Sequence, residues 1–287
     1  MIATDDGKRF VRKFQDWEEW LHQATRVAPP PNIILTSHRD GKADWAGTET
    51  FAEAERLARC GWPEGRERIT ETREAIKRVL CSKIIRPEPR MADAGDEIDV
   101  PVYLSGEPEH WIEYPITEAK ATGGRIISLG FNLFISSGVA KELFENRGAA
   151  MLAMIDALED GGYRCELNLC MGAACENGSL SYQMTVPVKQ PGDPSELDRL
   201  AMVLIHPAMF RRLQFAVGET DTGACRAAFG VSKYYWLPGR FDEASTMDFF
   251  FECMSSGEDN SAWLTPQSST AEVLRLLKAS GLVELED

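Results

Sequence analysis

The sequence lacks any apolar segment that approaches the roughly 20 residues needed to span a bilayer. Its first residues, MIATDDGKRFVRKFQDW, carry charges where a signal peptide needs an apolar core. The seven cysteines are an odd number without the pattern of a disulfide framework, which favours reduced thiols. We therefore expect no membrane association and a cytoplasmic location.

Basic residues are scarce, because 31 Lys and Arg stand against 45 Asp and Glu and give a net charge of -14. Affinity for nucleic acids depends largely on clustered Lys and Arg, so this charge disfavours a nucleic-acid partner. The imbalance is concentrated in residues 241–287, where ten acidic residues and two basic ones leave a net charge of -8. We expect this segment to be solvated or to face a basic partner.

The usual signatures of catalytic and cofactor sites are missing as well. Only four histidines are present, and none lies in a nucleophile motif. The sequence contains neither a phosphate-binding Gly-x-x-x-x-Gly-Lys-Ser/Thr motif nor a Gly-x-Gly-x-x-Gly after its first long strand. Cys165, Cys170 and Cys175 recur every five residues, but structural zinc sites use tight pairs of thiolates. We expect no cofactor, and we lean towards a protein that is not an enzyme.

The first 83 residues predict a small helical unit. Apolar residues recur at intervals of three and four in residues 12–25, as in an amphipathic helix. Thr48 or Thr50 can cap a second helix that ends at Gly61, and a third helix follows it directly. Together these last two helices form a predicted helical hairpin.

The remainder of the chain predicts a connecting segment and a second domain. Residues 84–123 are interrupted by Pro and Gly and contain one short candidate strand at residues 100–104. Residues 124–287 then predict an α/β domain that begins with a long buried strand at residues 125–135. The expected elements after it are a helix at 139–159, a strand at 163–171, a strand at 180–189, a helix from Asp193-Pro194, a strand at 247–254 and a helix at 271–280.

This order of elements resembles the von Willebrand A fold over residues 124–285. The segment Ala149–Glu166, AAMLAMIDALEDGGYRCE, is similar to the passage from the first helix into the second strand of that superfamily. The resemblance implies a mainly parallel sheet with helices on both faces and an antiparallel hairpin at one edge. It also implies a metal motif, Asp-x-Ser-x-Ser, which is replaced here by Asn132, Phe134 and Ser136.

Two groups of residues are candidates for binding. Open α/β sheets form a crevice at the carboxyl ends of their strands, and there we expect Asn132, Ser136, Ser137 and Asp193. The alternative is a loop in which Ser136 or Ser137 simply caps the next helix. The broken motif disfavours a metal, with Mg²⁺ binding as the minor alternative.

The second group is basic and consists of Arg211 and Arg212, with Lys233 and Arg226 nearby in the sequence. These side chains could face a phosphate or form intramolecular pairs. His206 precedes a proline that should divide a helix, and we expect it to have a structural role.

The whole chain resembles an uncharacterised family of bacteriophage and prophage proteins. The residues that carry this resemblance are Trp45-Ala46-Gly47, Cys60-Gly61-Trp62-Pro63-Glu64-Gly65, Asp99-Val100-Pro101, Arg147-Gly148-Ala149-Ala150 and His206-Pro207-Ala208. The leading hypothesis is a phage or prophage interaction protein that binds a protein partner through a metal-independent von Willebrand A-like domain. The alternatives are a nucleic-acid-handling factor with Trp45 and Trp62 as stacking surfaces, and a Mg²⁺-dependent binder.

Overall fold

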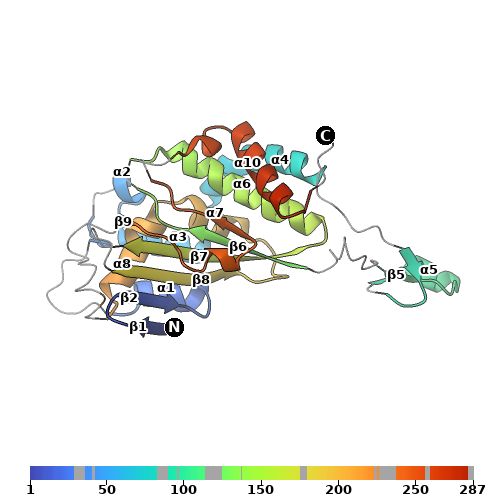
Figure 1. Ribbon diagram of the computed structural model, residues 1–287, viewed down its shortest axis with the longest axis horizontal. Coiled ribbons are helices and arrows are strands. Elements are labelled where there is room, and N and C mark those ends of the chain that lie inside the picture. The colour runs from blue at the N-terminus through green and yellow to red at the C-terminus, as the bar shows by residue number, and fades with distance from the viewer. Residues whose placement is uncertain are drawn as a thin grey trace.

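A computed structural model describes residues 1–28, 36–40, 43–82, 90–95, 97–113, 125–136, 138–174, 180–222, 225, 237–255 and 259–283. Its main feature is a seven-stranded sheet in the order β1-β2-β8-β7-β6-β10, with β9 paired to β7 outside this row (Figure 1). The strands are β1 (Ile2–Asp5), β2 (Arg9–Lys13), β6 (Ile126–Asn132), β7 (Arg164–Ala174), β8 (Ser181–Lys189), β9 (Leu237–Pro238) and β10 (Phe249–Phe251). Strand β6 is parallel to β7 and β10, and β7 and β8 form an antiparallel hairpin. The predicted α/β class, parallel centre and hairpin are thus confirmed.

Helices connect and cover these strands. They are α1 (Trp17–Thr25), α2 (Ala43–Ala46), α3 (Phe51–Cys60), α4 (Pro63–Cys81), α6 (Lys141–Asp160), α7 (Leu197–Ile205), α8 (Phe215–Glu219) and α10 (Pro266–Ala279), with the π-helix η1 (Met209–Gln214) and the 3-10 helices η2 (Ala244–Thr246) and η3 (Ser261–Trp263). Helix α3 begins as predicted, because Thr50 Oγ1 accepts a hydrogen bond from the backbone N of Glu53 at 3.2 Å. Helix α10 begins five residues before the predicted Ala271, because Thr265 forms a capping box with Ser268.

The N-terminal segment contains strands that the sequence analysis did not predict. Arg12 and Lys13 lie in β2, and α1 begins only at Trp17, where Asp16 Oδ1 accepts from the backbone N of Glu19 at 2.8 Å. Strand β2 pairs in parallel with β8, so the first residues of the chain belong to the large sheet.

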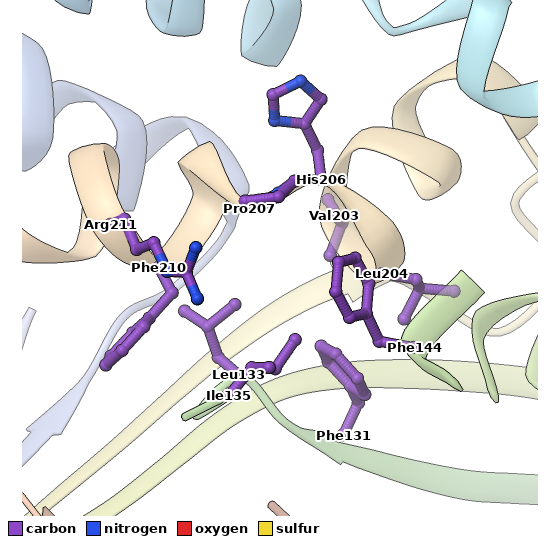
Figure 2. A pocket seen from close by; sticks show the side chains of 10 residues that line it. All are labelled: Phe131, Leu133, Ile135, Phe144, Val203, Leu204, His206, Pro207, Phe210 and Arg211. Carbon is purple, nitrogen blue, oxygen red and sulfur yellow. The ribbon is translucent and has the colours of Figure 1, made fainter. Parts of the chain in front are cut away.

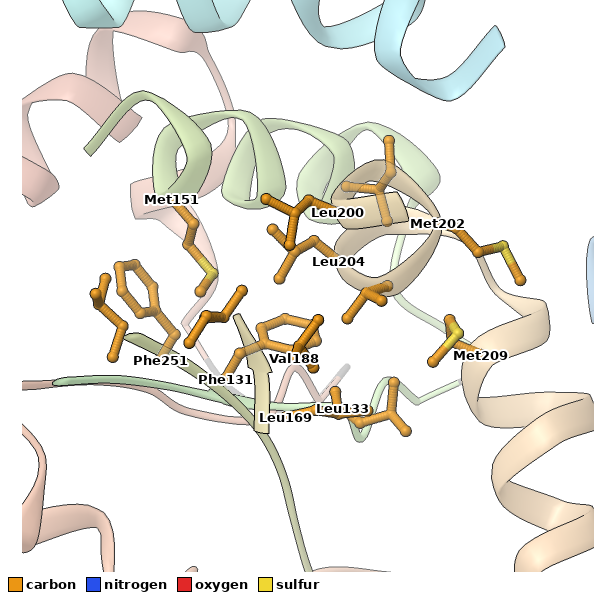
Figure 3. Packing of buried hydrophobic residues seen from close by; sticks show 14 of the residues in the cluster. Phe131, Leu133, Met151, Leu169, Val188, Leu200, Met202, Leu204, Met209 and Phe251 are labelled. Carbon is orange, nitrogen blue, oxygen red and sulfur yellow. The ribbon is translucent and has the colours of Figure 1, made fainter. Parts of the chain in front are cut away.

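One hydrophobic cluster fills the space between the sheet and the helices. Phe131 of β6 and Leu204 of α7 meet within it (Figure 3), and Phe10 of β2 belongs to the same cluster. Residues of both predicted units, 1–83 and 124–287, therefore contribute to one sheet and one core.

The two faces of the large sheet are covered differently in the described part of the chain. Helices α1, α6, α7 and α8 lie on the face that carries Phe131, whereas residues 239–248, between β9 and β10, cover the face that carries Gln183. There Gln183 Nε2 donates to the carbonyl of Arg240 at 2.8 Å, and a Cβ atom at Gly172 would lie 2.5 Å from the carbonyl oxygen of Gly239. On this side the expected helices are replaced by irregular chain that includes the short 3-10 helix η2, and small and polar side chains of the sheet allow this segment to approach closely.

The described residues of 90–113 form a separate small unit. It has an antiparallel sheet in the order β3-β5-β4, and Figure 1 shows it apart from the large sheet. Its elements are β3 (Arg90–Ala92), β4 (Glu97–Ile98), α5 (Val100–Ser105) and β5 (Trp111–Glu113). The strand predicted at residues 100–104 is wrong. These residues form a helix because the Asp99 side chain accepts from the backbone N of Val102 at 3.1 Å and Pro101 occupies the first turn.

By length and apolar character, no single helix in the described ranges qualifies to cross a membrane. Helix α7 and residues Met209–Glu219 meet the criterion only when taken together, and they are bent by 70°.

Candidate functional site

The carboxyl end of β6 is built from core side chains rather than from ligands. Asn132 is fully buried, and its Oδ1 accepts from the backbone N of Phe134 at 3.1 Å. Phe134 is itself buried, and its ring centroid lies 4.8 Å from that of Phe210 in η1. Phe134, at the middle position of the expected metal motif, therefore packs η1 against the end of the sheet.

A cavity of about 10 Å³ lies beside this edge, between β6 and the junction of α7 with η1 (Figure 2). Its lining consists of Phe131, Leu133, Ile135, Phe144, Val203, Leu204, His206, Pro207, Phe210 and Arg211. A volume of this size holds at most about one water molecule. In Figure 2 the imidazole of His206 points away from the apolar side chains of β6. This cavity therefore offers no room for an organic ligand.

The other predicted edge residues do not assemble around Asn132. Ser136 is bound locally, because its backbone N donates to the carbonyl of Met254 at 2.9 Å and its carbonyl accepts from the backbone N of Val139. Ser137 lies outside the described residues. The N-cap of α6 is Ala140, so the predicted capping of this helix by Ser136 does not occur.

Asp193 lies at the opposite end of the sheet from Asn132. It follows β8, which runs antiparallel to β7, so the chain leaves β8 near the amino end of β6, whereas Asn132 is at the carboxyl end. The carboxyl-end rule brings together residues that follow parallel strands, and β8 is not one of them. Helix α7 also begins later than predicted, at Leu197 instead of Asp193-Pro194.

Asp193 instead lines a hollow of about 300 Å³ that it shares with Lys189, Glu196 and Arg199. Lys189 is already paired, because its Nζ donates to Glu159 Oε1 at 2.6 Å and to the carbonyl of Cys165. Arg199 forms an ion pair with Glu196 in the same helical turn. The hollow carries charges of both signs, and those of Lys189, Glu196 and Arg199 are already paired, so they do not indicate what the hollow would bind. We assign no ligand to this hollow.

Arg211 and Arg212 do not form a free basic surface. The guanidinium of Arg212 is buried and donates to four carbonyl oxygens, those of Ser37, Arg39, Thr48 and Glu49, at 2.6–3.1 Å. Arg211 donates to the carbonyl of Trp45 and lies 5.6 Å from the centroid of its ring. Both side chains bind the segment before α3 to η1. Arg226 and Lys233 lie outside the described residues.

His206 has a structural role at the break between α7 and η1. Its Nδ1 accepts from the backbone N of Ala208 at 3.1 Å, and its ring packs edge-on against Trp62, with 4.5 Å between centroids. Burial lowers the pKa of His206 to about 3, so the imidazole is neutral. The proline after it divides the helix as predicted, and His206 caps the segment that follows instead of bonding a freed carbonyl.

Ser37, His38 and Glu219 form a cluster that no motif in the sequence indicates. Ser37 Oγ lies 2.8 Å from His38 Nδ1 and also donates to Glu219 Oε2, while Glu219 Oε1 accepts from the backbone N of Thr36 at 2.6 Å. In a nucleophilic triad the carboxylate orients the imidazole, whereas here it binds the serine, which is fully buried. Burial raises the pKa of the Glu219 carboxyl. The cluster holds the turn at residues 36–38 and does not present a nucleophile.

The cysteines are thiols in the described part of the chain, where no set of three His, Cys, Asp or Glu side chains could hold a metal ion. Burial raises the pKa of Cys165 to about 12 and also raises that of Cys170. Thiols that resist ionisation are poor nucleophiles and poor metal ligands. Cys175 lies outside the described residues.

The small unit of residues 90–113 exposes an unusually large share of apolar side chains in the described part of the chain. None of its described residues is buried, and it holds five of the eleven large apolar side chains that are exposed in the described part of the chain. Val100, Tyr103 and Leu104 are 57%, 54% and 77% exposed and lie at helical positions i, i+3 and i+4. They therefore share the outer face of α5.

The small unit is also strongly acidic. Residues 90–113 contain seven Asp and Glu and a single basic residue, Arg90, for a net charge of -6. Arg90 pairs with Glu113 at 2.6 Å. Four carboxylates, those of Asp93, Glu97, Glu107 and Glu109, have no ion-pair partner among the described residues. The apolar and acidic residues of the small unit are visible in the sequence, but they lie within residues 84–123, which we predict only as a connecting segment.

Comparison with known proteins identifies a family but no characterised relative. No curated protein and no solved structure matches the chain. A family model described as "Domain of unknown function (DUF7192)" matches residues 3–284, which include the small unit as well as the large sheet. Because this match spans nearly the whole sequence, the chain belongs to the family of that domain of unknown function.

Proposed function

We propose that the chain is a non-enzymatic interaction protein that binds a protein partner through the small unit of residues 90–113. The observation that carries this proposal is the outer face of α5, where Val100, Tyr103 and Leu104 are all more than half exposed. Contiguous exposed apolar side chains on a soluble domain mark protein or membrane contacts. The adjacent unpaired carboxylates disfavour a membrane, whose cytoplasmic surface is negatively charged.

The large sheet serves as the scaffold in this proposal. Its strand order β8-β7-β6-β10, with α6 and α7 connecting the strands, supports the von Willebrand A-like assignment. The buried Asn132 and Phe134 at the end of β6 support metal-independent binding. The sequence resemblance to phage and prophage proteins supports a mobile-element origin, and the free thiols fit the reducing cytoplasm of a host cell.

A nucleic-acid-handling role is the weaker alternative. Trp62, one of its two proposed stacking surfaces, is buried against His206, and Trp45 lies beneath Arg211. Trp62 therefore offers no free ring to a base, and the half-buried ring of Trp45 is covered by Arg211.

The test is affinity purification of the tagged full chain from the cells that express it naturally, alongside two matched variants. Leu104→Asp removes an apolar side chain from the outer face of α5, and Leu264→Asp makes the same change at a site on the body of the protein that is 62% exposed. We expect a stoichiometric protein that the parent chain and Leu264→Asp retain and that Leu104→Asp loses. Equal retention by both variants, or no stoichiometric protein at all, would contradict the proposal.

Enzymatic activity is tested separately on the purified chain. We expect no turnover of nucleotides or nucleic acids above the level of a mock purification. Turnover that a point change in one pocket abolishes would show that the protein is an enzyme.

A further inference from the structure

We infer that the partner of the small unit is a different protein whose contact surface is apolar and bordered by Lys and Arg, and not a second copy of this chain. This inference rests on the proposed function, because it names the chemistry of the same contact. It depends on where the charges of the small unit are and on which of them are already neutralised.

The apolar part of the contact requires an apolar counterpart. Val100, Tyr103 and Leu104 project from one side of α5, and Ile98 immediately before it is 42% exposed. These four exposed apolar side chains lie within seven consecutive residues, 98–104. Covering such a surface removes apolar area from water, which is the main favourable contribution to most protein associations.

The unpaired carboxylates of the small unit determine which sign of charge the contact surface of the partner should carry. Asp93, Glu97, Glu107 and Glu109 are exposed, and none is paired in the described part of the structure. A partner with Lys and Arg around its apolar centre would be steered towards these carboxylates and would neutralise them. A nucleic acid or an anionic membrane would be repelled.

The same charges exclude a second copy as the occupant. An isologous dimer through α5 would bring two units of net charge -6 together. Like charges placed opposite one another in an interface oppose association. Among the described residues of the small unit the one basic side chain, Arg90, is already held by Glu113 and does not neutralise the other carboxylates.

The experiment uses the full chain and two designed amphipathic helical peptides as probes, one of Leu and Lys and the other of Leu and Glu. Binding is measured by fluorescence anisotropy at 50 mM and 300 mM salt. We expect the Leu–Lys peptide to bind, with an affinity that falls as salt rises, and the Leu–Glu peptide not to bind. Leu104→Asp should abolish binding of the Leu–Lys peptide even though it adds a negative charge, because the apolar contact is lost. Leu264→Asp should bind like the parent chain.

A pair of charge variants separates the local contact from the overall acidity of the protein. Glu107→Lys with Glu109→Lys should weaken binding of the Leu–Lys peptide by about tenfold at 50 mM salt, from the usual strength of exposed ion pairs. Glu67→Lys with Glu71→Lys makes the same change of net charge on an exposed face of α4 and should have little effect. Equal weakening by both pairs would overturn the inference, because net charge alone would then explain binding.

Sedimentation equilibrium of the full chain tests whether a second copy of the chain binds at α5. We expect no self-association that depends on Leu104. Self-association that Leu104→Asp abolishes, or stronger binding of the Leu–Glu peptide, would overturn the inference about the partner's chemistry. A purified partner that depends on Leu104 but has an acidic contact surface would also overturn it and leave the proposed function intact.

Discussion

Replacing Arg12 by Met should destabilise the whole protein, because Arg12 is the charged centre of a buried contact between β2 and Asp221, which lies 209 positions later in the sequence. Its guanidinium is fully buried in β2, its Nε and Nη2 donate to Asp221 at 2.8–3.0 Å, and its Nη1 donates to Asp5 at 2.6 Å. Hydrogen bonds to these carboxylates raise the pKa of Arg12 above its usual value although burial lowers it, so the guanidinium stays charged.

The cost of this change follows from the carboxylate that remains. Asp221 is 6% exposed, and Arg12→Met removes the buried guanidinium that its carboxylate binds. Removing one partner of a buried ion pair costs about 3–5 kcal/mol in the free energy of unfolding. Replacing both partners by apolar residues, Arg12→Met with Asp221→Leu, should return the stability to within about 1 kcal/mol of the parent or raise it.

The assay is urea unfolding followed by far-UV circular dichroism and by tryptophan fluorescence. With a slope of about 3 kcal/mol per M, Arg12→Met should lower the midpoint by about 1–1.7 M without changing the slope. The two signals should coincide, because the N-terminal tryptophans and the large sheet share one core. A single variant that costs less than about 1 kcal/mol, or a double variant that costs the sum of both changes, would refute the reasoning.

Three further predictions concern the junctions around α7 and η1. Gly61→Ala should lower the thermal midpoint more than Gly192→Ala. Both positions have positive φ, at +82° and +88°, but only at Gly61 would the new Cβ atom approach a neighbour, at 2.5 Å from that of Asp198. Arg212→Lys should cost about 2–3 kcal/mol and accelerate hydrogen exchange at residues 36–50, because an ammonium cannot reach four carbonyls at once. Burial lowers the pKa of His206 to about 3, so as pH falls from 6.5 the unfolded chain takes up the proton first, and stability should decline by up to about 1.4 kcal/mol per pH unit. In His206→Asn, urea unfolding between pH 4.5 and 7 should show a smaller decline.

Local signals in the sequence predicted much of the fold. The cap at Thr50, the buried strand that became β6 and the hairpin of β7 and β8 all depend on neighbouring residues, so a single sequence contains them. Strand β2 was missed because its residues RFVRK place a charge at a core position, and the residue that makes this tolerable, Asp221, lies 209 positions away. A contact between residues so far apart in the chain leaves no periodic pattern in the sequence.

The candidate site shows a different limit of prediction. The aligned motif begins at the end of β6, but the packing there depends on η1, a π-helix that brings Phe210 onto Phe134. Asp193 was grouped with Asn132 because each follows a strand in the sequence. Asp193 and Asn132 lie apart because β8 runs antiparallel to β7. The direction of a strand in a sheet is set by the topology and not by the local sequence.

The end of β6 and the small unit of residues 90–113 also differ in how far apolar burial offsets the conformational entropy lost when the backbone is ordered. At the end of β6 the described apolar side chains pack within the shared core, so a partner would gain little further burial there. In the small unit, by contrast, three short strands and one six-residue helix bury no residue completely. Isolated sheets of this size are marginal in water, because fixing the backbone costs about 1–2 kcal/mol per residue. Covering Val100, Tyr103 and Leu104 would supply the apolar burial that this unit lacks by itself. In the proposed contact, binding would therefore be coupled to ordering of the small unit, which favours α5 over the edge of the large sheet as the place where the partner binds.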